Sequence, residues 1–324
     1  MQEDLVYDIS FIIPCYKSEK TIGYVIDEIS AMTERLIISN YEVICVDDCS
    51  PDNVYGALVK ISNLNPNVRA IRFSKNFGQH AGIIAGIRYS RGNICVILDD
   101  DGQCPLDQID ALIQPLSQGY DVSMAFYSKK KQSLFKNAGS KFNDIVAKLL
   151  IDKPKDIQMT NFIAFKRFIA DEISRYHGPY PYISGLLFRS SAKVINVPME
   201  ERERMAGGTT YTFKKLVALW TNSFTAFSIK PLRIATIVGS GAAVFGVILA
   251  VVTAVRKIII PAITIGWSST ISVILVLGGL ILFVLGIIGE YIGRIYMSIN
   301  ETPQYVIAEK HNIKTNENEK CHFE

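Results

Sequence analysis

The sequence lacks the features that mark several large classes of protein. Six cysteines in 324 residues are too few for a disulfide scaffold, and no pair of them has zinc-finger spacing. A net charge of +3, from 34 basic and 31 acidic residues, is too small to indicate a nucleic-acid partner. The first ten residues lack the basic start and apolar core of a secretory signal. We therefore expect roughly the first two hundred residues to stay in a reducing cytoplasm.

Apolar sequence is what the chain has in excess, and most of it lies late. Charged residues make up 20% of the chain, below the ~25% of an average globular protein, and mean hydropathy is +0.21. Two uncharged runs, Ile234–Val255 and Ile258–Gly289, are each long enough as helices to cross a ~30 Å hydrocarbon layer. Buried core helices are the alternative, but the short basic segment between the runs favours a transmembrane hairpin.

Basic residues near the ends of these runs predict the orientation of the hairpin. Arg256 and Lys257 lie between the runs, whereas five basic residues flank them on the outside. Because basic residues concentrate on the cytoplasmic side, both termini are expected in the cytoplasm. Apolar residues at helical spacing between Phe213 and Phe227 also predict a helix that lies in the membrane interface. The five flanking residues are Lys214, Lys215, Lys230, Arg233 and Arg294.

Before the hairpin, short apolar runs alternate with helical patterns. This alternation indicates an α/β fold with a mainly parallel sheet that helices cover on both faces. Ligands bind such sheets at the carboxyl ends of the strands. The predicted strands are Ile9–Ile13, Glu42–Val46, Val68–Phe73, Ile94–Leu98 and Val122–Phe126. The predicted helices are Thr21–Ile37, Asn53–Ile61, Gln79–Tyr89 and Leu106–Leu116.

Three polar clusters follow predicted strands, at residues 14–19, 47–52 and 99–103, and they should meet at one edge of the sheet. In the third cluster, Asp99 and Asp101 are two residues apart and project to the same side of an extended segment. Their carboxylates and the Gln103 amide are hard oxygen ligands suited to Mg²⁺ or Mn²⁺, with a diphosphate completing the shell. A solvated turn is the alternative, but three clusters at one edge favour a metal site.

Several stretches resemble motifs of the inverting GT-A glycosyltransferases, in the branch that acts on polyprenyl phosphates. They are VDDCSPDN, RFSKNFGQHAGIIAGIRYSRGN and ILDDDGQCP. The run RMAGGTTY, which begins at Arg204, is similar to the R-x-x-G-x-S-x-Y of that branch, and GEYIGRIY closes the second apolar run. Dolichyl-phosphate mannose synthase, bactoprenol glucosyltransferases and the undecaprenyl-phosphate formamido-arabinose transferase belong to this branch. The resemblance extends from about Ser10 to Tyr305.

The resemblance implies roles for residues along the whole chain. The implied nucleotide-sugar site consists of Pro14, Tyr16, Glu19, Asp47, Asp48, Asp99 and Lys129. Asp99, Asp101 and Gln103 are implied metal ligands, and Lys136, Ser140 and Arg204 are implied to bind the acceptor phosphate. Asp101, Lys136, Asn161 and Arg204 are expected to be catalytic. Surface charges are the alternative for Lys129, Lys136 and Arg204, and His80 is expected to begin a helix without chemistry.

One position departs from the resemblance. Many bactoprenol glucosyltransferases carry an aspartate in a G-D-F-R-like motif where this chain has Thr160-Asn161-Phe162-Ile163. An amide cannot act as a carboxylate base, which disfavours glucose as the sugar. A phosphate monoester has a second pKa of about 6 and is mostly a dianion at neutral pH, so an acceptor of this kind needs orientation more than deprotonation.

The resemblance implies a metal-dependent, inverting transfer of a sugar from a UDP-sugar to polyprenyl phosphate at the cytoplasmic membrane face. We expect a catalytic domain at 1–210, an interfacial helix at 211–232, two transmembrane helices at 233–290 and a cytoplasmic tail at 291–324, disordered after Gln304. Small residues in the hairpin permit a homo-oligomer. Two alternatives stay open. A processive polysaccharide synthase should have a Q-x-x-R-W motif and more spans, and a membrane-tethered nucleotide-sugar binding protein should have no turnover.

Overall fold

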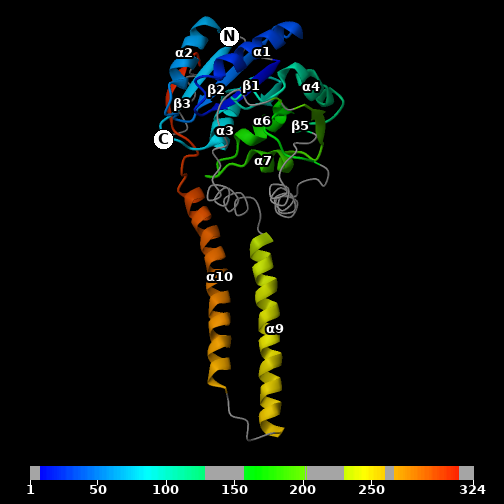
Figure 1. Cartoon of the computed structure of the whole chain (residues 1–324), viewed down its shortest axis with the longest axis vertical. Coiled ribbons are helices and arrows are strands. Elements are labelled where there is room, and N and C mark those ends of the chain that lie inside the picture. Colours follow the sequence, from blue (N-terminus) through cyan, green and yellow to red (C-terminus); the bar gives the residue numbers. More distant parts are fainter. Residues whose placement is uncertain (1–7, 128–156, 201, 203–229, 260–265, 314–324) are drawn as a thin grey trace.

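The computed structural model describes residues 8–127, 157–200, 202, 230–259 and 266–313. An α/β domain stands at one end, and two long helices extend from it (Figure 1). The predicted interfacial helix at Phe213–Phe227 lies outside the described residues.

The described strands form one eight-stranded sheet in the order β7-β5-β6-β4-β1-β2-β3-β8. Strands β1 to β4 run parallel, whereas β6 runs antiparallel to both β4 and β5. The mainly parallel sheet that the sequence predicts is therefore confirmed. The strands are β1 (Ile9–Cys15), β2 (Tyr41–Asp47), β3 (Val68–Phe73), β4 (Ile94–Ile97), β5 (Val122–Tyr127), β6 (Ile163–Lys166), β7 (Val194–Met199) and β8 (Ile307–His311).

Helices cover both faces of the sheet because alternate residues of the central strands point to opposite sides. In β1, Phe11 and Ile13 pack with α1, α2 and α4, whereas Ile12 packs with α3, α6 and α7. These side chains are fully buried. The helices are α1 (Ile22–Arg35), α2 (Val54–Leu64), α3 (Gln79–Tyr89), η1 (Leu106–Gln108), α4 (Ile109–Ser117), α6 (Arg167–Ser174) and α7 (Ile183–Ser190).

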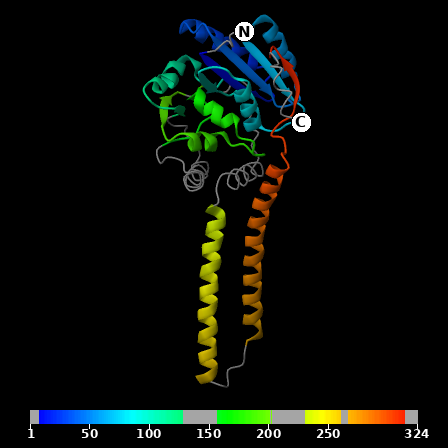
Figure 2. The same cartoon turned by 180° about the vertical axis from the view of Figure 1, so that it is seen from behind.

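Two long helices, α9 (Lys230–Ile259) and α10 (Trp267–Ile299), lie side by side and run in opposite directions in both views (Figures 1 and 2). The predicted runs fall within or close to them, but α10 begins at Trp267 and continues past Gly289. Within the described residues, one helical segment, Val276–Ile299, is long and apolar enough to cross a membrane.

After α10 the chain returns to the sheet, so the predicted disorder after Gln304 is wrong as far as residue 313. Strand β8 pairs antiparallel with β3, which places it at the sheet edge (Figure 2). The Tyr305 ring stacks on Phe73 with ring centroids 5.1 Å apart. The Asn312 side chain donates hydrogen bonds to the carbonyls of Pro66 and Val68. Most of β8 is exposed, and pairing rather than burial holds it in place.

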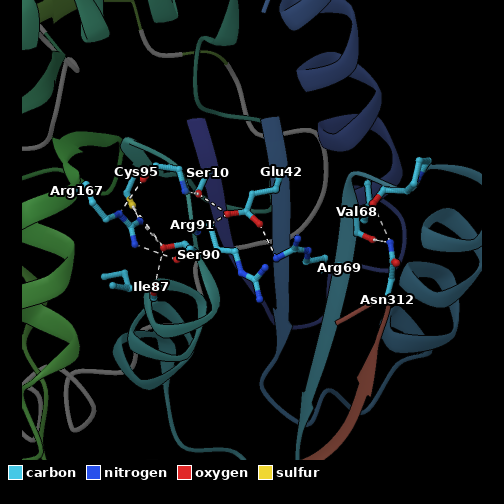
Figure 3. A network of polar contacts seen from close by, with 12 residues as sticks. Ser10, Glu42, Val68, Arg69, Ile87, Ser90, Arg91, Cys95, Arg167 and Asn312 are labelled. Carbon is cyan, nitrogen blue, oxygen red and sulfur yellow. Dashed lines mark hydrogen bonds and ion pairs between the residues drawn. The ribbon is translucent and has the colours of Figure 1, made fainter. Parts of the chain in front are cut away.

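A buried polar network closes the amino-terminal edge of the sheet (Figure 3). Glu42 is fully buried, accepts hydrogen bonds from Ser10 Oγ at 2.6 Å and Arg91 N at 2.5 Å, and pairs with Arg69 at 2.6 Å. Nearby, the Arg167 guanidinium donates to the carbonyl oxygens of residues 90 and 92. The partners of Glu42, namely Ser10, Arg91 and Arg69, offset the cost of burying its carboxylate. The opposite, carboxyl edge is where the predicted ligand-binding residues lie.

Candidate active site

The pairing of β4 with β6 brings Asp99 and Asn161 together. Ile97 of β4 lies opposite Ile163 of β6, and the two strands are antiparallel. Asp99 follows Ile97 by two residues and Asn161 precedes Ile163 by two, so both lie at the carboxyl edge of β4. Asn161 Nδ2 is 3.1 Å from Asp99 Oδ2. The register therefore places an amide donor directly on one of the predicted metal ligands.

A second amide reaches Asp99 from helix α3. Gln79 is the first residue of α3, and its Nε2 donates to Asp99 Oδ1 at 2.8 Å. Two hydrogen bonds from separate elements fix the direction in which this carboxylate points. The sequence motifs do not predict this role for Gln79, because it depends on where α3 starts relative to β4.

The loop after Asp99 holds the other predicted metal ligands in a tight turn. Gly102 has φ of 77°, a conformation that glycine adopts without strain. Asp101 Oδ1 accepts a hydrogen bond from the backbone N–H of Gln103 at 3.1 Å. The Gln103 side-chain nitrogen donates to the carbonyl of Arg202, which lies shortly after β7. Asp99, Asp101 and Gln103 are all partly exposed.

This edge fits a divalent cation when a further ligand brings oxygens of its own. It supplies two carboxylates, Asp99 and Asp101, and one amide oxygen, Gln103. No group of three or more His, Cys, Asp or Glu side chains suited to a metal is found among the described residues. Magnesium is commonly held by one or two carboxylates together with substrate phosphates, and this donor set matches that pattern. The ligand assignment stays a prediction.

The middle aspartate of the triplet, Asp100, connects the β4 loop to the β1 loop. Its Oδ2 accepts from the backbone N–H of Tyr16 at 2.9 Å, and its carbonyl accepts from Thr21 Oγ1 at 2.7 Å. Burial raises the pKa of the Asp100 carboxyl, while the hydrogen bond from Tyr16 opposes this shift. Asp100 therefore organises the predicted nucleotide site, although the sequence motifs predict no role for it.

The loops after β1 and β2 are joined by reciprocal hydrogen bonds. Glu19 N donates to Asp52 Oδ2 at 3.0 Å, and Asn53 N donates to Glu19 Oε2 at 3.2 Å. Lys17 and Cys49 both adopt left-handed backbone conformations, with φ of 59° and 52°. Such conformations are uncommon outside glycine and concentrate at functional sites. Of the predicted nucleotide-binding residues in the first loop, Pro14 is buried and Tyr16 is exposed.

The two aspartates at the end of β2 make different contacts. The Asp48 carboxylate accepts from the backbone N–H groups of Phe77 at 2.6 Å and Gly78 at 2.8 Å, and thereby holds the loop before α3. Burial raises the pKa of Asp48 to about 6. Asp47 Oδ1 accepts from Ser50 N at 2.8 Å, and its Oδ2 lies 3.4 Å from Arg72 Nε. Asp48 therefore holds the loop before α3, whereas Asp47 holds Ser50 and pairs with Arg72. Both carboxylates are buried, and their binding to a nucleotide stays a prediction.

His80 is the second residue of α3, at the predicted helix start, and its side chain is partly buried. Its ring packs edge-on against Tyr182 at 5.3 Å, and its Nδ1 is buried without a hydrogen-bond partner among the described residues. Burial lowers the pKa of His80 to about 4, so the ring is neutral at physiological pH. His80 thus packs beside Gln79 as a neutral aromatic group.

Four predicted site residues lie outside the described residues: Lys129, Lys136, Ser140 and Arg204. Their assigned contacts with the donor and acceptor phosphates stay predictions. The described site thus contains the predicted donor residues other than Lys129, together with Asn161.

Residues 10–177 match the family described as glycosyl transferase family 2, and residues 230–295 match the GtrB C-terminal hairpin. The chain belongs to glycosyl transferase family 2 and is a glycosyltransferase with a GT-A fold. The family and fold that the sequence motifs imply are therefore confirmed.

Relatives match the chain over nearly its whole length. The uncharacterized glycosyltransferase YkcC of Bacillus subtilis (strain 168) is 32% identical over 308 residues, which cover 94% of each chain. An undecaprenyl-phosphate 4-deoxy-4-formamido-L-arabinose transferase of Photorhabdus laumondii is 30% identical and covers 98% of this chain and 99% of its own. Glucosyl-3-phosphoglycerate synthase from Mycobacterium tuberculosis, solved with Mn²⁺ and UDP-glucose, has a TM-score of 0.52 at 17% identity, covering 68% of this chain and 77% of its own. That likeness shows the fold alone.

Proposed function

We propose that this glycosyltransferase moves a sugar from a UDP-sugar to a polyprenyl phosphate, undecaprenyl phosphate in bacteria, at the cytoplasmic face of the cell membrane. The names of several relatives that match at about 30% identity over almost the whole chain support the acceptor. The matched residues include both the α/β domain and the hairpin.

The observation that carries this proposal is the contact between the end of α10 and the catalytic domain. The Arg294 guanidinium lies over the Tyr180 ring, 4.9 Å from its centroid, and Tyr180 OH is 3.7 Å from Met297 Sδ. Tyr180 belongs to the loop between α6 and α7. The root of the hairpin therefore lies against this loop.

The same loop continues to the acidic cluster. Tyr182 packs against His80, and the neighbouring Gln79 donates to Asp99. The described contacts thus form a short path from the hairpin to the predicted donor site. On this proposal, a lipid phosphate at the membrane around the hairpin approaches a sugar bound at Asp99 from the side of this loop.

In the proposed reaction, the residues of the site have different roles. Tyr16 and Asp47 bind the nucleotide, and Asn161 and Gln79 orient Asp99 at the diphosphate. A divalent cation, Mg²⁺ or Mn²⁺, bound by Asp99, Asp101 and Gln103 would neutralise the charge that develops on the departing nucleotide diphosphate. An oxygen of the lipid phosphate attacks the anomeric carbon from the opposite face, so the configuration inverts.

The lipid phosphate needs no protein base in this scheme. Most of it is already a dianion near neutral pH, because its second pKa is about 6. Lys136, Ser140 and Arg204 hold the acceptor phosphate, and Lys129 contacts the donor. Asn161 donates a hydrogen bond and takes no part in proton transfer.

A transfer assay on membranes that contain the full chain tests this proposal. The membranes are incubated with a panel of radiolabelled nucleotide sugars, and label is counted in the solvent-extractable lipid. We expect one UDP-sugar to label lipid, and the signal to disappear with EDTA or in Asp101→Ala. Label in water-insoluble polymer would indicate a synthase, and no transfer with any donor would contradict the proposed function.

A further inference from the structure

We infer that Arg202, a residue with no role in the proposed reaction, is a positioning residue that turns the oxygen of Gln103 toward the cation. The inference rests on the proposed function, since it concerns the same metal site. The contact with Arg202 also gives a physical reason for the orientation of the Gln103 amide.

The hydrogen bond between Gln103 and Arg202 fixes which end of the amide is available. Gln103 Nε2 lies 3.3 Å from the Arg202 carbonyl oxygen. A carbonyl oxygen can only accept, so the amide nitrogen must face it and the amide oxygen must face away. The oxygen is the end that a hard cation binds. A flipped amide would instead present a donor to the cation and lose the hydrogen bond to Arg202.

The carbonyl that imposes this orientation is itself fixed by two sets of contacts. The backbone N–H of Arg202 donates to the carbonyl of Gln103 at 3.3 Å, so the two residues are linked in both directions. The Arg202 guanidinium makes ion pairs with Glu28 of α1 and Asp107 of η1, one through each terminal nitrogen. Because the side chains of Arg202 and Glu28 are only 32% and 17% exposed, solvent screens their pair less than a surface pair.

The ion pairs therefore act on the metal site indirectly. They hold the Arg202 backbone against the loop at residues 101–103, and the backbone orients the Gln103 side chain. Contacts of this kind around a metal ligand commonly alter metal affinity by 10–100-fold. Arg202 also precedes the predicted acceptor residue Arg204 by two positions in the chain.

A metal-binding titration tests the inference without measuring activity. The full chain in detergent is saturated with UDP as the nucleotide probe, and Mn²⁺ binding is followed by electron paramagnetic resonance. Thermal unfolding of each variant reports whether it is folded. We expect Arg202→Gln to weaken Mn²⁺ binding roughly tenfold. Arg202→Lys should recover part of this loss, because an ammonium group cannot reproduce the two-pronged pairing of a guanidinium.

Glu28→Gln provides a second, milder variant that leaves both Gln103 and Arg202 in place. It should weaken Mn²⁺ binding in the same direction by a smaller factor. The matched control is Arg175→Gln, which breaks an exposed ion pair with Glu172 on α6 and should leave Mn²⁺ binding unchanged.

Coupling to Gln103 separates positioning from general structural support. If Arg202 acts through Gln103, adding Arg202→Gln to Gln103→Ala should cause no further loss of Mn²⁺ affinity. Full additivity of the two losses, or unchanged binding in folded Arg202→Gln, would overturn the inference. Wild-type protein that binds no Mn²⁺ in the presence of UDP would instead contradict the proposed metal site itself, and the inference with it.

Discussion

At the scale of single residues, amide side chains organise the acidic cluster. Gln79 and Asn161 approach Asp99 from α3 and from the segment before β6, while Gln103 lies in the loop after β4. An amide can hold a carboxylate in place without competing with a cation for its charge. These contacts support the proposed role of Asn161 at a position where many bactoprenol glucosyltransferases carry an aspartate.

The first prediction compares Asn161 with Asp101. Removing one hydrogen bond to a charged group costs about 1.5–3 kcal/mol, so Asn161→Ala should lower the rate of sugar transfer by roughly 10–100-fold. Asp101→Ala should abolish transfer, because it removes a predicted metal ligand. Steady-state transfer to lipid measured across pH provides the comparison. An Asn161→Ala enzyme as inactive as Asp101→Ala, or a rise in rate with a pKa well above that of the lipid phosphate, would indicate a protein base.

The second prediction concerns Asp48. Burial raises the pKa of this residue from 3.8 to about 6. Between these values the folded protein binds a proton that the unfolded chain releases. The stability that this group contributes is therefore present below about pH 4 and is lost as pH rises to about 6. The melting temperature of wild type minus that of Asp48→Asn should fall over this interval and then stay level. Exposed Asp171→Asn is the control, and a difference that grows with pH would contradict the assignment.

At the scale of elements, the sequence predicts what local patterns determine. Apolar runs identify β1 to β5, and the helices between them fall close to their predicted bounds. Strand β8 is missed because Ile307–His311 is mostly exposed and resembles a polar tail, and only its pairing with β3 makes it a strand. The contact between Asp99 and Asn161 depends on the register of β6, which local sequence patterns do not predict. The spacing of residues in the sequence indicates neither the pairing of β8 with β3 nor the register of β6.

The third prediction tests the attachment of this returning segment. Tyr305 stacks on Phe73, and its OH accepts a hydrogen bond from Arg88 at 3.2 Å. Tyr305→Ala should lower stability by about 2–3 kcal/mol, somewhat less than for a fully buried aromatic side chain. Tyr305→Phe keeps the stacking and should cost only about 1 kcal/mol. Thermal unfolding of the full chain measures both, and equal losses in the two variants would show that stacking contributes little.

At the scale of the whole molecule, contacts beyond the chain connection join the hairpin to the α/β domain. The chain leaves the domain, forms α9 and α10, and then returns to add β8 to the sheet edge (Figure 2). Gln304 strengthens this return by donating to the carbonyls of Tyr176 and Gly178. The described contacts therefore tie the carboxyl-terminal end of the hairpin to the catalytic domain. A fragment that ends before α9 would lack one strand of its own sheet.

The fourth prediction concerns the membrane topology of the chain. With both termini in the cytoplasm, residues 256–257 should face the opposite side of the membrane. A cysteine introduced by Lys257→Cys should react with an impermeant thiol reagent in intact cells, whereas Cys321 should react only after the cells are opened. The reverse pattern would place the acidic cluster on the side of the membrane that lacks nucleotide sugars.

In the proposed reaction the lipid receives the sugar and not the sugar phosphate. The most direct test uses purified full chain, undecaprenyl phosphate, a divalent cation and the UDP-sugar that labels membranes. This donor carries radiocarbon in the sugar and radiophosphorus in the phosphate next to it. We expect the lipid to contain radiocarbon without radiophosphorus, and to contain neither label with Asp101→Ala. Both labels in the lipid would show transfer of a sugar phosphate, and that result would contradict the proposed function.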